Sequence, residues 1–392
     1  MSDLPAFDLV VGGIPRFLAE APWAWRLLSR YLRQLHAAKR TETPGRAPTV
    51  ADAQGRAAIV LVQADAEAYM LPEVARRLVR RLEERPDLAL VLPVSNEPWC
   101  EEARLAPPFA YQTPTLLSEA VALIARSNAP LRAAEEPDSP VFAVRREVLQ
   151  ALAPSLPLEE VPREARRRGL SAAIDPGAYV HRYGSMDASA REDLAAKVLP
   201  GMTAVLDVGC SRGATAPALR SRGVTRIVGI EPDADDAAEA ARHYDHVLTA
   251  HLEEVAEDLR GQFDAALFGD VLEHLEDPSD ALARVRPWLK AGGLVIASVP
   301  NVGHWSVIDD LLRGRFDYVP YSLLSGTHIR FFTRRTAEDL FEASGYRVRE
   351  IDTVVLPPSL EGSARLDRLR SLPEASDDLA VAEFLVVAQA GG

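Results

Sequence analysis

Asp207, Gly209, Gly213 and Glu231 have the types and spacing that bind an adenosine-containing cofactor. The apolar run at residues 205–208 leads into the two glycines, which let a backbone turn approach a ligand closely. Asp207 can take up an ammonium group, and Glu231, after a second apolar run, can accept hydrogen bonds from both hydroxyls of a ribose. Because a carboxylate at Asp207 would repel a pyrophosphate, the pattern favours S-adenosylmethionine over a dinucleotide.

The turn after the apolar run at residues 263–268 holds Asp270, Glu273 and His274. Methyl transfer to a hydroxyl needs a base that takes up the proton, and histidine suits that role at neutral pH. We therefore expect His274 to act as the base, with Asp270 beside it as a catalytic and donor-binding residue. The alternative is that Glu273 and His274 are structural or contact only the donor.

The D-x-x-E-H spacing of Asp270, Glu273 and His274 also offers two carboxylates and an imidazole to a divalent ion. The side chain of Asp270 is short for that purpose, and the sequence assigns no fourth ligand. We expect no metal cofactor, and we keep these three residues as the ligands to test.

A long connection spans residues 300–333, and long connections at the carboxyl ends of strands usually carry function. His304 and His328 within it could supply a second base. Its aromatic side chains could stack on a ring or a sugar, and they are Trp305, Phe316, Tyr318 and Tyr321. The alternative is that these aromatic residues only pack the connection.

The elements that must position these residues alternate between strand and helix from residue 187 onward. Apolar runs predict strands at 204–208, 226–230, near 247, 263–268 and 293–299. Such alternation gives a parallel sheet with helices on both faces and the ligand at the carboxyl ends of the strands. Strands at 346–355 and 382–388 follow the last helix, at 336–344, without an obvious helix between them, so we expect an antiparallel strand.

These motifs, in this order, resemble the class I S-adenosylmethionine-dependent methyltransferases, in particular the bacterial type 11, 12 and 23 branches, over nearly all of residues 187–392. The resemblance implies a Rossmann-like seven-stranded sheet with an antiparallel last strand. Ser211 departs from the family's usual glycine, and His251 stands where relatives commonly have a carboxylate for the adenine amino group. The resemblance carries donor binding onto Asp207, Gly209, Gly213 and Glu231. We expect the adenine ring to be held either by His251 or by Leu252 and backbone, and we also predict donor contacts from Cys210, Pro232 and Asp270.

Two further resemblances concern the acceptor. The D-x-x-E-H spacing looks like the E-x-x-E-H motif by which some ubiquinone-pathway and small-RNA O-methyltransferases bind a divalent ion. The strings at residues 300–305 and 327–333 resemble a bacterial branch that is often found beside or fused to glycosyltransferases. That neighbourhood implies a glycan acceptor.

Residues 57–186 look like the second half of a family 2 glycosyltransferase, a GT-A-like α/β domain. Asp65 stands near the place of the metal motif, Glu159 and Glu160 replace the base motif, and His181 comes one place early. The nucleotide-binding half would have to fit into residues 1–56, which show none of its strands. We therefore expect a degenerate, partial domain that binds or positions a glycan or mediates assembly.

In residues 1–56 we predict a basic amphipathic helix at 15–40 and a linker at 41–56. The helix either packs on its own domain or lies on an anionic membrane surface. The formal net charge of −13 argues against a nucleic-acid partner. Two distant cysteines, Cys100 and Cys210, fit a reducing compartment, and no apolar run spans a bilayer, so we expect a cytoplasmic protein.

Taken together, the sequence predicts an S-adenosylmethionine-dependent O-methyltransferase that acts on a sugar of a surface polysaccharide or on a glycosylated metabolite. The partner is then a small-molecule or glycan acceptor, and a homodimer is compatible with the sequence. Two alternatives remain open. One is a bifunctional glycosyltransferase-methyltransferase, and the other is a non-catalytic scaffold that binds the donor.

Overall fold

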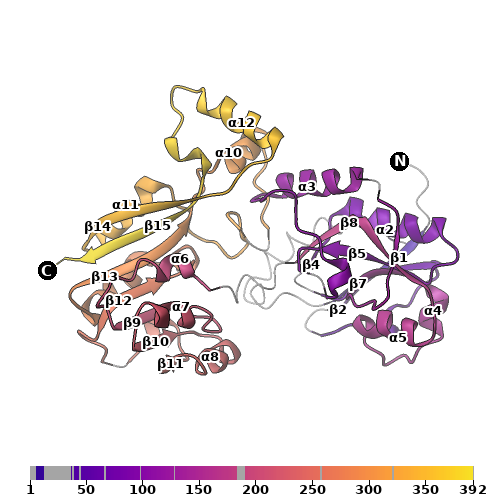
Figure 1. Ribbon diagram of the computed structural model, residues 1–392, viewed down its shortest axis with the longest axis horizontal. Helices are drawn as coiled ribbons and strands as arrows, with labels where there is room; N and C mark the ends of the chain where they lie inside the picture. Colours follow the sequence, from indigo (N-terminus) through magenta and orange to yellow (C-terminus); the bar gives the residue numbers. More distant parts are fainter. Residues whose placement is uncertain are drawn as a thin grey trace. The chain divides into compact units, whose positions relative to one another are not determined.

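The computed structural model describes residues 6–12, 37, 39–43, 46–65, 68–97, 99–127, 129–182, 190–256, 258–319 and 322–391. The chain divides into two compact units, each built on its own sheet (Figure 1). The first comprises Met1–Gly184, Asp317–Tyr321 and Ser325–Thr327, and the second comprises Ser185–Phe316, Ser322–Leu324 and His328–Gly392. The predicted boundary at residue 187 and most of the predicted helix at 15–40 lie outside the described residues.

The second unit is built on a seven-stranded sheet with the order β11-β10-β9-β12-β13-β15-β14 (Figure 1). The strands from β11 to β13 in this order are parallel, whereas β15 runs antiparallel to both β13 and β14. The predicted Rossmann-like sheet with its antiparallel last strand is therefore confirmed. The strands are β9 (Ala204–Val208), β10 (Arg226–Ile230), β11 (His246–Leu248), β12 (Phe263–Phe268), β13 (Leu289–Pro300), β14 (Tyr346–Val355) and β15 (Val381–Ala390).

The central strands of this sheet are covered on both faces. Strand β9 reads Ala-Val-Leu-Asp-Val and is buried along its whole length, as a strand between two layers must be. Leu206 packs into one apolar cluster with Phe268, while its neighbour Val205 packs into a second cluster with Leu267. Because the faces are filled with apolar side chains, polar groups that contact a ligand must come from the strand ends and the turns that follow them.

Seven α-helices of the second unit belong to the described residues: α6 (Glu192–Ala195), α7 (Ala216–Ser221), α8 (Ala234–Ala240), α9 (Pro278–Val285), α10 (Trp305–Leu312), α11 (Arg334–Ala343) and α12 (Leu360–Arg370). The expectation of no helix between the last two strands was wrong, because α12 lies there. Gly362 and Ser363 in its first turn are poor helix formers, so the sequence of this segment does not predict a helix clearly. The Ser359 hydroxyl accepts a hydrogen bond of 2.9 Å from the Gly362 N–H and begins the helix as its N-cap.

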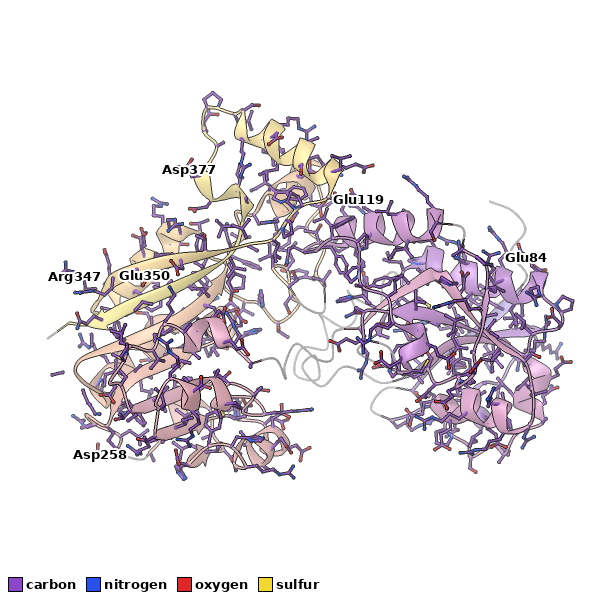
Figure 2. The ribbon with its side chains drawn as sticks, viewed as in Figure 1. Glu84, Glu119, Asp258, Arg347, Glu350 and Asp377 are labelled. Carbon is purple, nitrogen blue, oxygen red and sulfur yellow. The ribbon has the colours of Figure 1, made fainter. Side chains whose placement is uncertain are left out.

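The edge strand β14 carries charged side chains on its exposed positions. Arg347 and Glu350 lie on it and extend from the ribbon in Figure 2. The Lys197 ammonium group pairs with Glu350 at 2.7 Å and also with Asp352. Charges of this kind discourage an edge strand from pairing with a strand of another molecule.

The first unit is a mixed sheet with the order β2-β1-β3-β7-β5-β8-β4, and β6 pairs with β8. Its strands are β1 (Phe7–Gly12), β2 (Lys39–Thr43), β3 (Ile59–Gln63), β4 (Ala68–Tyr69), β5 (Leu90–Ser95), β6 (Arg132–Ala133), β7 (Val141–Arg145) and β8 (Ala172–Arg182). Its described helices are α2 (Pro72–Glu84), α3 (Pro114–Arg126), α4 (Arg146–Gln150) and α5 (Val161–Arg167). Among the described helices of both units, none is long and apolar enough to cross a bilayer.

The prediction that residues 1–56 hold only a helix and a linker was wrong. Strands β1 and β2 lie in this segment and pair in parallel with each other, and β1 also pairs in parallel with β3. The polar sequence Lys-Arg-Thr-Glu-Thr of β2 shows no apolar alternation, because an edge strand is only partly buried. The first unit therefore has strands that we expected to be missing, while its glycosyltransferase-like character stays a prediction.

Candidate active site

The turn after β9 has the backbone shape of a glycine-rich ligand loop. Gly209 and Gly213 have φ angles of +70° and +79°. A Cβ on Gly209 would lie 2.6 Å from Cγ2 of Val271, and one on Gly213 would lie 2.9 Å from Cε2 of Tyr244. Ser211 has a φ of +44°, which L-residues other than asparagine and aspartate rarely adopt. The turn is therefore tightly constrained at the carboxyl end of β9, as the motif predicts.

Asp207, the predicted ligand of the donor's ammonium group, lies buried in β9 with 6% exposure. The Tyr244 hydroxyl donates a hydrogen bond of 2.5 Å to its Oδ2. Burial raises the pKa of Asp207 to about 6, although the hydrogen bond from Tyr244 lowers it. A cationic ligand group would favour the ionised carboxylate. Tyr244 was missed from sequence, because no motif connects a tyrosine after α8 with β9.

Glu231, the predicted ribose ligand, is 9% exposed beside the glycine turn. Its Oε2 accepts a hydrogen bond of 2.9 Å from the Ser211 N–H, and its Oε1 accepts one of 2.9 Å from the Asp233 N–H. Burial raises the pKa of Glu231, and the two backbone donors oppose this rise. The carboxylate thus joins the ends of β9 and β10 and keeps further lone pairs for hydroxyl donors.

Two neighbours of this turn were predicted as donor contacts. Cys210 is buried, and a Cβ on Gly229 would lie 2.5 Å from its Sγ, so the thiol packs against β10. Burial raises the pKa of the Cys210 thiol. Pro232 is exposed after Glu231. Pro232 therefore lies at the surface, whereas the Cys210 side chain lies in the core. Only the backbone of Cys210 faces the turn.

The predicted adenine contacts lie on the loop after β11. His251 is exposed, and its N–H donates a hydrogen bond of 3.3 Å to Oε2 of Glu254. Leu252 is 6% exposed and packs in the same apolar cluster as Val208 and Ile230. Leu252 thus borders the ends of both donor-site strands, and the adenine role of both residues stays a prediction.

Asp270, predicted to contact donor and acceptor, is held in an ion-pair network. Nη1 of Arg191 donates to Oδ2 of Asp270 and, at 2.9 Å, to the Ser298 hydroxyl. The Ser298 hydroxyl donates a hydrogen bond of 2.8 Å to Oδ1 of Asp270, and Nη2 of Arg191 donates to Oε1 of Glu383 at 2.8 Å. Both carboxylate oxygens of Asp270 therefore already accept hydrogen bonds.

The pKa values of the carboxyl groups of Asp270 and Glu383 in this network are shifted in opposite directions. Partial desolvation disfavours the ionised form of Asp270, whose side chain is still 47% exposed, but Arg191 and its other partners outweigh this effect and lower the pKa of Asp270. Burial and the charge of Asp270 together raise the pKa of Glu383. Arg191 and Glu383 were missed from sequence. For Glu383 a signal was available, because the beginning of the antiparallel last strand must lie beside the carboxyl ends of the parallel strands.

Glu273, His274 and His328 form a second cluster, in which one ligand atom from each lies within 4.8 Å of the others. Glu273 is 1% exposed, and in the described part of the chain neither of its carboxylate oxygens has a hydrogen-bond partner. Nε2 of His328 lies 3.9 Å from Oε1 of Glu273. The exposed His274 ring meets the His328 ring edge-on, with 4.8 Å between centroids. Asp270 is not a member of this group.

The protonation of the cluster follows from burial. Burial and the charge of Asp270 raise the pKa of Glu273 well above its usual range. Burial and the neighbouring His274 lower the pKa of His328 to about 4. The Nδ1 atom of His328 lies 3.2 Å from the Leu323 carbonyl, which indicates a proton on Nδ1 and leaves the lone pair of Nε2 toward Glu273. The cluster thus has room for a shared proton or a cation.

His304 and the aromatic residues of the long connection have mostly structural contacts. His304 is buried before α10, with its Nδ1 2.8 Å from the Ser306 hydroxyl, and burial lowers its pKa to about 4. Trp305 is 2% exposed, and a Cβ on Gly362 of α12 would lie 2.9 Å from its ring. Phe316 packs edge-on against Phe331 at 5.8 Å.

Ion pairs of Asp309 join helix α10 to α12. Asp309 is 2% exposed and pairs with Arg313 at 2.9 Å, Arg368 at 3.1 Å and Arg365 at 3.3 Å. These contacts favour the packing interpretation for Trp305 and His304. Tyr321 lies outside the described residues, and a catalytic role of His304 stays a prediction.

Comparison with known proteins gives a methyltransferase match that covers the end of the first unit and most of the second. Residues 160–351 match a family model described as a methyltransferase domain. The ubiquinone biosynthesis O-methyltransferase of Nitrobacter winogradskyi is 30% identical over 160 residues, which are 39% of this chain and 60% of that protein. Its counterpart from Pseudomonas paraeruginosa is 32% identical over 138 residues, 33% of this chain and 57% of that protein. The chain thus spans less than two thirds of the curated relatives it matches.

Among solved structures, a putative S-adenosylmethionine-dependent methyltransferase from Listeria monocytogenes is 18% identical, with a TM-score of 0.38, and the match covers 54% of this chain and all of that chain. The family match, the relatives, the sheet order and the glycine turn agree. The family match and the relatives support an S-adenosylmethionine-dependent methyltransferase, and the sheet order is that of the class I fold. S-adenosylmethionine is the cofactor that this family implies.

Proposed function

We propose that the second unit transfers the methyl group of S-adenosylmethionine to a hydroxyl oxygen of a small-molecule acceptor, and that the acceptor is a sugar of a surface polysaccharide or of a glycosylated metabolite. Transfer to oxygen is supported by the names of the curated relatives, which are O-methyltransferases. The sugar is supported by the strings at residues 300–305 and 327–333 and by the presence of the first unit in the same chain.

The observation that carries the proposal is the cluster of Glu273, His274 and His328 after β12. The exposed His274 imidazole takes up the proton of the acceptor hydroxyl. The oxygen forms a bond to the methyl carbon as the bond from that carbon to sulfur breaks, and S-adenosylhomocysteine leaves. His328, packed edge-on against His274, and the buried Glu273 position this imidazole.

The same cluster fits a divalent cation. A buried carboxyl group without a hydrogen-bond partner and an imidazole lone pair facing it are groups that a cation would satisfy. When bound, a cation would lower the pKa of an acceptor hydroxyl. We expect that no metal is required, and an assay with a chelator tests this expectation.

The experiment measures transfer of labelled methyl groups to a panel of methyl glycosides, with and without EDTA. We expect His274→Ala to lower turnover by about 100-fold or more while donor binding persists. His243→Ala removes another exposed histidine and serves as the matched control. Full activity of His274→Ala would remove the base assignment. Turnover on phenols but on no glycoside would contradict the sugar acceptor.

The two alternatives predict different results. A bifunctional enzyme would hydrolyse nucleotide sugars in a reaction that depends on manganese and on Asp65, and the strands β1 and β2 keep this hypothesis open. A scaffold would bind the donor with an affinity that His274→Ala does not change, and it would methylate no glycan.

A further inference from the structure

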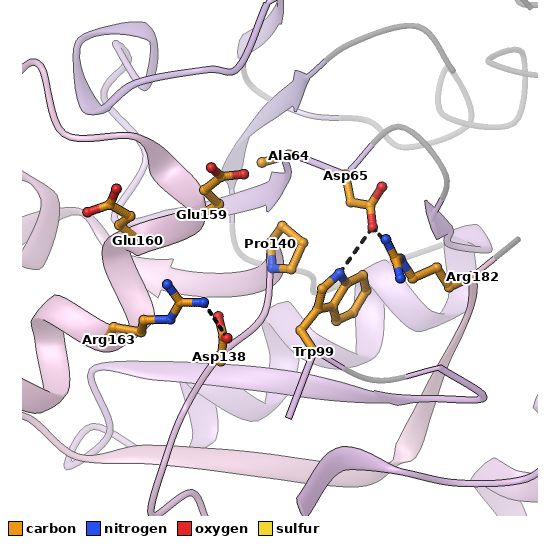
Figure 3. Close-up of a pocket in the computed structure, with 9 residues that line it drawn as sticks. All are labelled: Ala64, Asp65, Trp99, Asp138, Pro140, Glu159, Glu160, Arg163 and Arg182. Carbon is orange, nitrogen blue, oxygen red and sulfur yellow. Dashed lines mark hydrogen bonds and ion pairs between the residues drawn. The ribbon is translucent and has the colours of Figure 1, made fainter. Parts of the chain in front are cut away.

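The first unit holds a pocket of about 480 Å³, a volume typical of small-molecule sites. Its lining combines Trp99 and Pro140 with four carboxylates and two guanidinium groups. Figure 3 shows Trp99 and Pro140 in the middle of the lining, with Asp65 and Arg182 on one side and the glutamates on the other. The pocket lies wholly within one unit and none of its residues belongs to the methyl-donor site.

The guanidinium groups of the lining are paired with carboxylates. Nε of Arg182 donates to Oδ2 of Asp65 at 2.8 Å, and Nε1 of Trp99 donates to the same oxygen at 3.1 Å. Nη2 of Arg163 pairs with Oδ2 of Asp138 at 2.5 Å. Two opposite charges cancel in each pair, so the remaining charge of the lining comes from the two glutamates.

This charge distribution is unfavourable for a nucleoside diphosphate. Phosphate groups are bound by guanidinium and ammonium groups that are available to them, whereas Arg163 and Arg182 already bind carboxylates. Glu159 and Glu160 would add repulsion to a diphosphate. Asp65 is also poorly placed to bind a cation that would carry the phosphates, because Arg182 supplies positive charge to it.

The same lining suits a polyhydroxylated, uncharged ligand. Carboxylate oxygens accept hydrogen bonds from hydroxyl groups, and a sugar offers several hydroxyls on neighbouring carbons. The guanidinium groups donate to ring and hydroxyl oxygens without leaving their carboxylates, since each has five N–H donors. Trp99 and Pro140 supply an apolar surface for the C–H groups of the ring.

We propose that this pocket binds an uncharged saccharide through Asp65, Trp99 and the glutamates, and that it does not bind a nucleoside diphosphate. The ligand is a pyranose unit of a glycan or glycoside. This binding site is independent of methyl transfer, so its existence does not depend on the proposed acceptor.

Saturation-transfer NMR on the full chain tests the proposal, with methyl glycosides of glucose, galactose, mannose, rhamnose and N-acetylglucosamine as probes. We expect at least one glycoside to bind, Trp99→Ala to weaken its binding by about tenfold or more, and Trp99→Phe, which keeps an aromatic surface, to weaken it less. Glu160→Gln should weaken it, while Glu101→Gln, an exposed change outside the pocket, should leave it unchanged.

Three results would overturn the proposal: binding of none of the glycosides, glycoside binding that Trp99→Ala leaves intact, or binding of uridine or guanosine diphosphate sugars with manganese that Trp99→Ala abolishes. S-adenosylhomocysteine binding is measured on every variant as a check of the second unit. A failure in the first unit is thereby distinguished from loss of the methyl-donor site.

Discussion

The guanidinium group of Arg191 and the carboxyl group of Glu383 meet at 2.8 Å although 192 positions separate them in the chain. Arg191 precedes α6 and Glu383 lies in β15, so the pair joins the beginning of the described part of the second unit to its last strand. Arg191 also pairs with Asp193 and Asp270. One partly buried cation thus balances three carboxyl groups at the carboxyl end of the sheet.

Arg191→Met should destabilise the second unit by about 1 to 2 kcal/mol, because Asp270 and Glu383 would lose the cation between them, although the Asp270 side chain is 47% exposed. Urea unfolding followed by a probe in this unit measures the loss. Arg242→Met, at an exposed surface pair, should change stability little. The double variant Arg191→Met with Asp270→Asn should recover part of the loss. A cost for Arg191→Met no larger than that of the control would contradict the role of the network.

Glu231→Gln should weaken S-adenosylmethionine binding by about tenfold or more, since an amide offers one acceptor atom where the carboxylate offers two. Isothermal titration measures the affinity. Glu239→Gln on α8 is the matched control, because it alters an exposed pair with Arg242 and leaves the turn intact. Equal affinities of the two variants would remove Glu231 from the donor site.

Donor binding should weaken as the pH falls through about 6. The ammonium group of the donor favours the ionised form of Asp207, whose pKa is raised to about 6 by burial. Below that pH the carboxylate must first lose a proton, so affinity should fall by about tenfold between neutral pH and pH 5. Titrations across this range in wild type and in Asp207→Asn test the assignment. Asp207→Asn should bind weakly with little pH dependence, and a wild-type affinity that is constant over the range would contradict the prediction.

Glu273→Gln should stabilise the protein at neutral pH in the absence of added cations. The pKa of Glu273 is raised in the folded state, so both states are protonated in acid and no cost arises there. Above about pH 4.3 the unfolded chain loses the proton first, and wild-type stability falls with rising pH by up to about 1.4 kcal/mol per unit until the folded pKa is reached. Glutamine lacks this cost.

The measurement is the difference in unfolding free energy between wild type and Glu273→Gln at several pH values. The gap should widen from about pH 5 to pH 7, and Glu253→Gln, at an exposed position, should show no such gap. Manganese that stabilises wild type but not Glu273→Gln would support a cation in the cluster. A gap that does not change with pH would refute the buried-acid explanation.

Strand positions in the second unit could be predicted because its central strands are buried on both faces and read as mainly apolar runs, as in β9 and β12, each of which has a single aspartate. Strand β2 and helix α12 could not, because a polar edge strand and a helix with Gly362 in its first turn lack a clear period. Tertiary pairing rather than local pattern determines both elements.

The donor site likewise contains residues that the sequence predicts and residues that it does not. Asp207 and Glu231 follow from spacing along one supersecondary unit, since Asp207 lies in β9 and Glu231 directly follows β10, which pairs with β9. Tyr244 and Arg191 reach their partners across 37 and 79 positions of sequence. Many tyrosines and arginines in the chain could make such hydrogen bonds, so spacing alone does not select the ones that do.

The reversed direction of β15 also decides where a probe can be attached. Glu383 near its start lies beside Asp270, whereas Ala390 at its end pairs with Tyr346, and the Gly391 N–H donates to the Gly345 carbonyl at 3.1 Å. At about 3.4 Å per residue, the seven steps from Glu383 to Ala390 carry the chain about 24 Å away from the donor turn. A fluorophore or a surface tether joined to Gly391 would therefore lie at the end of the strand opposite to Asp270, which suits sensor or immobilisation experiments.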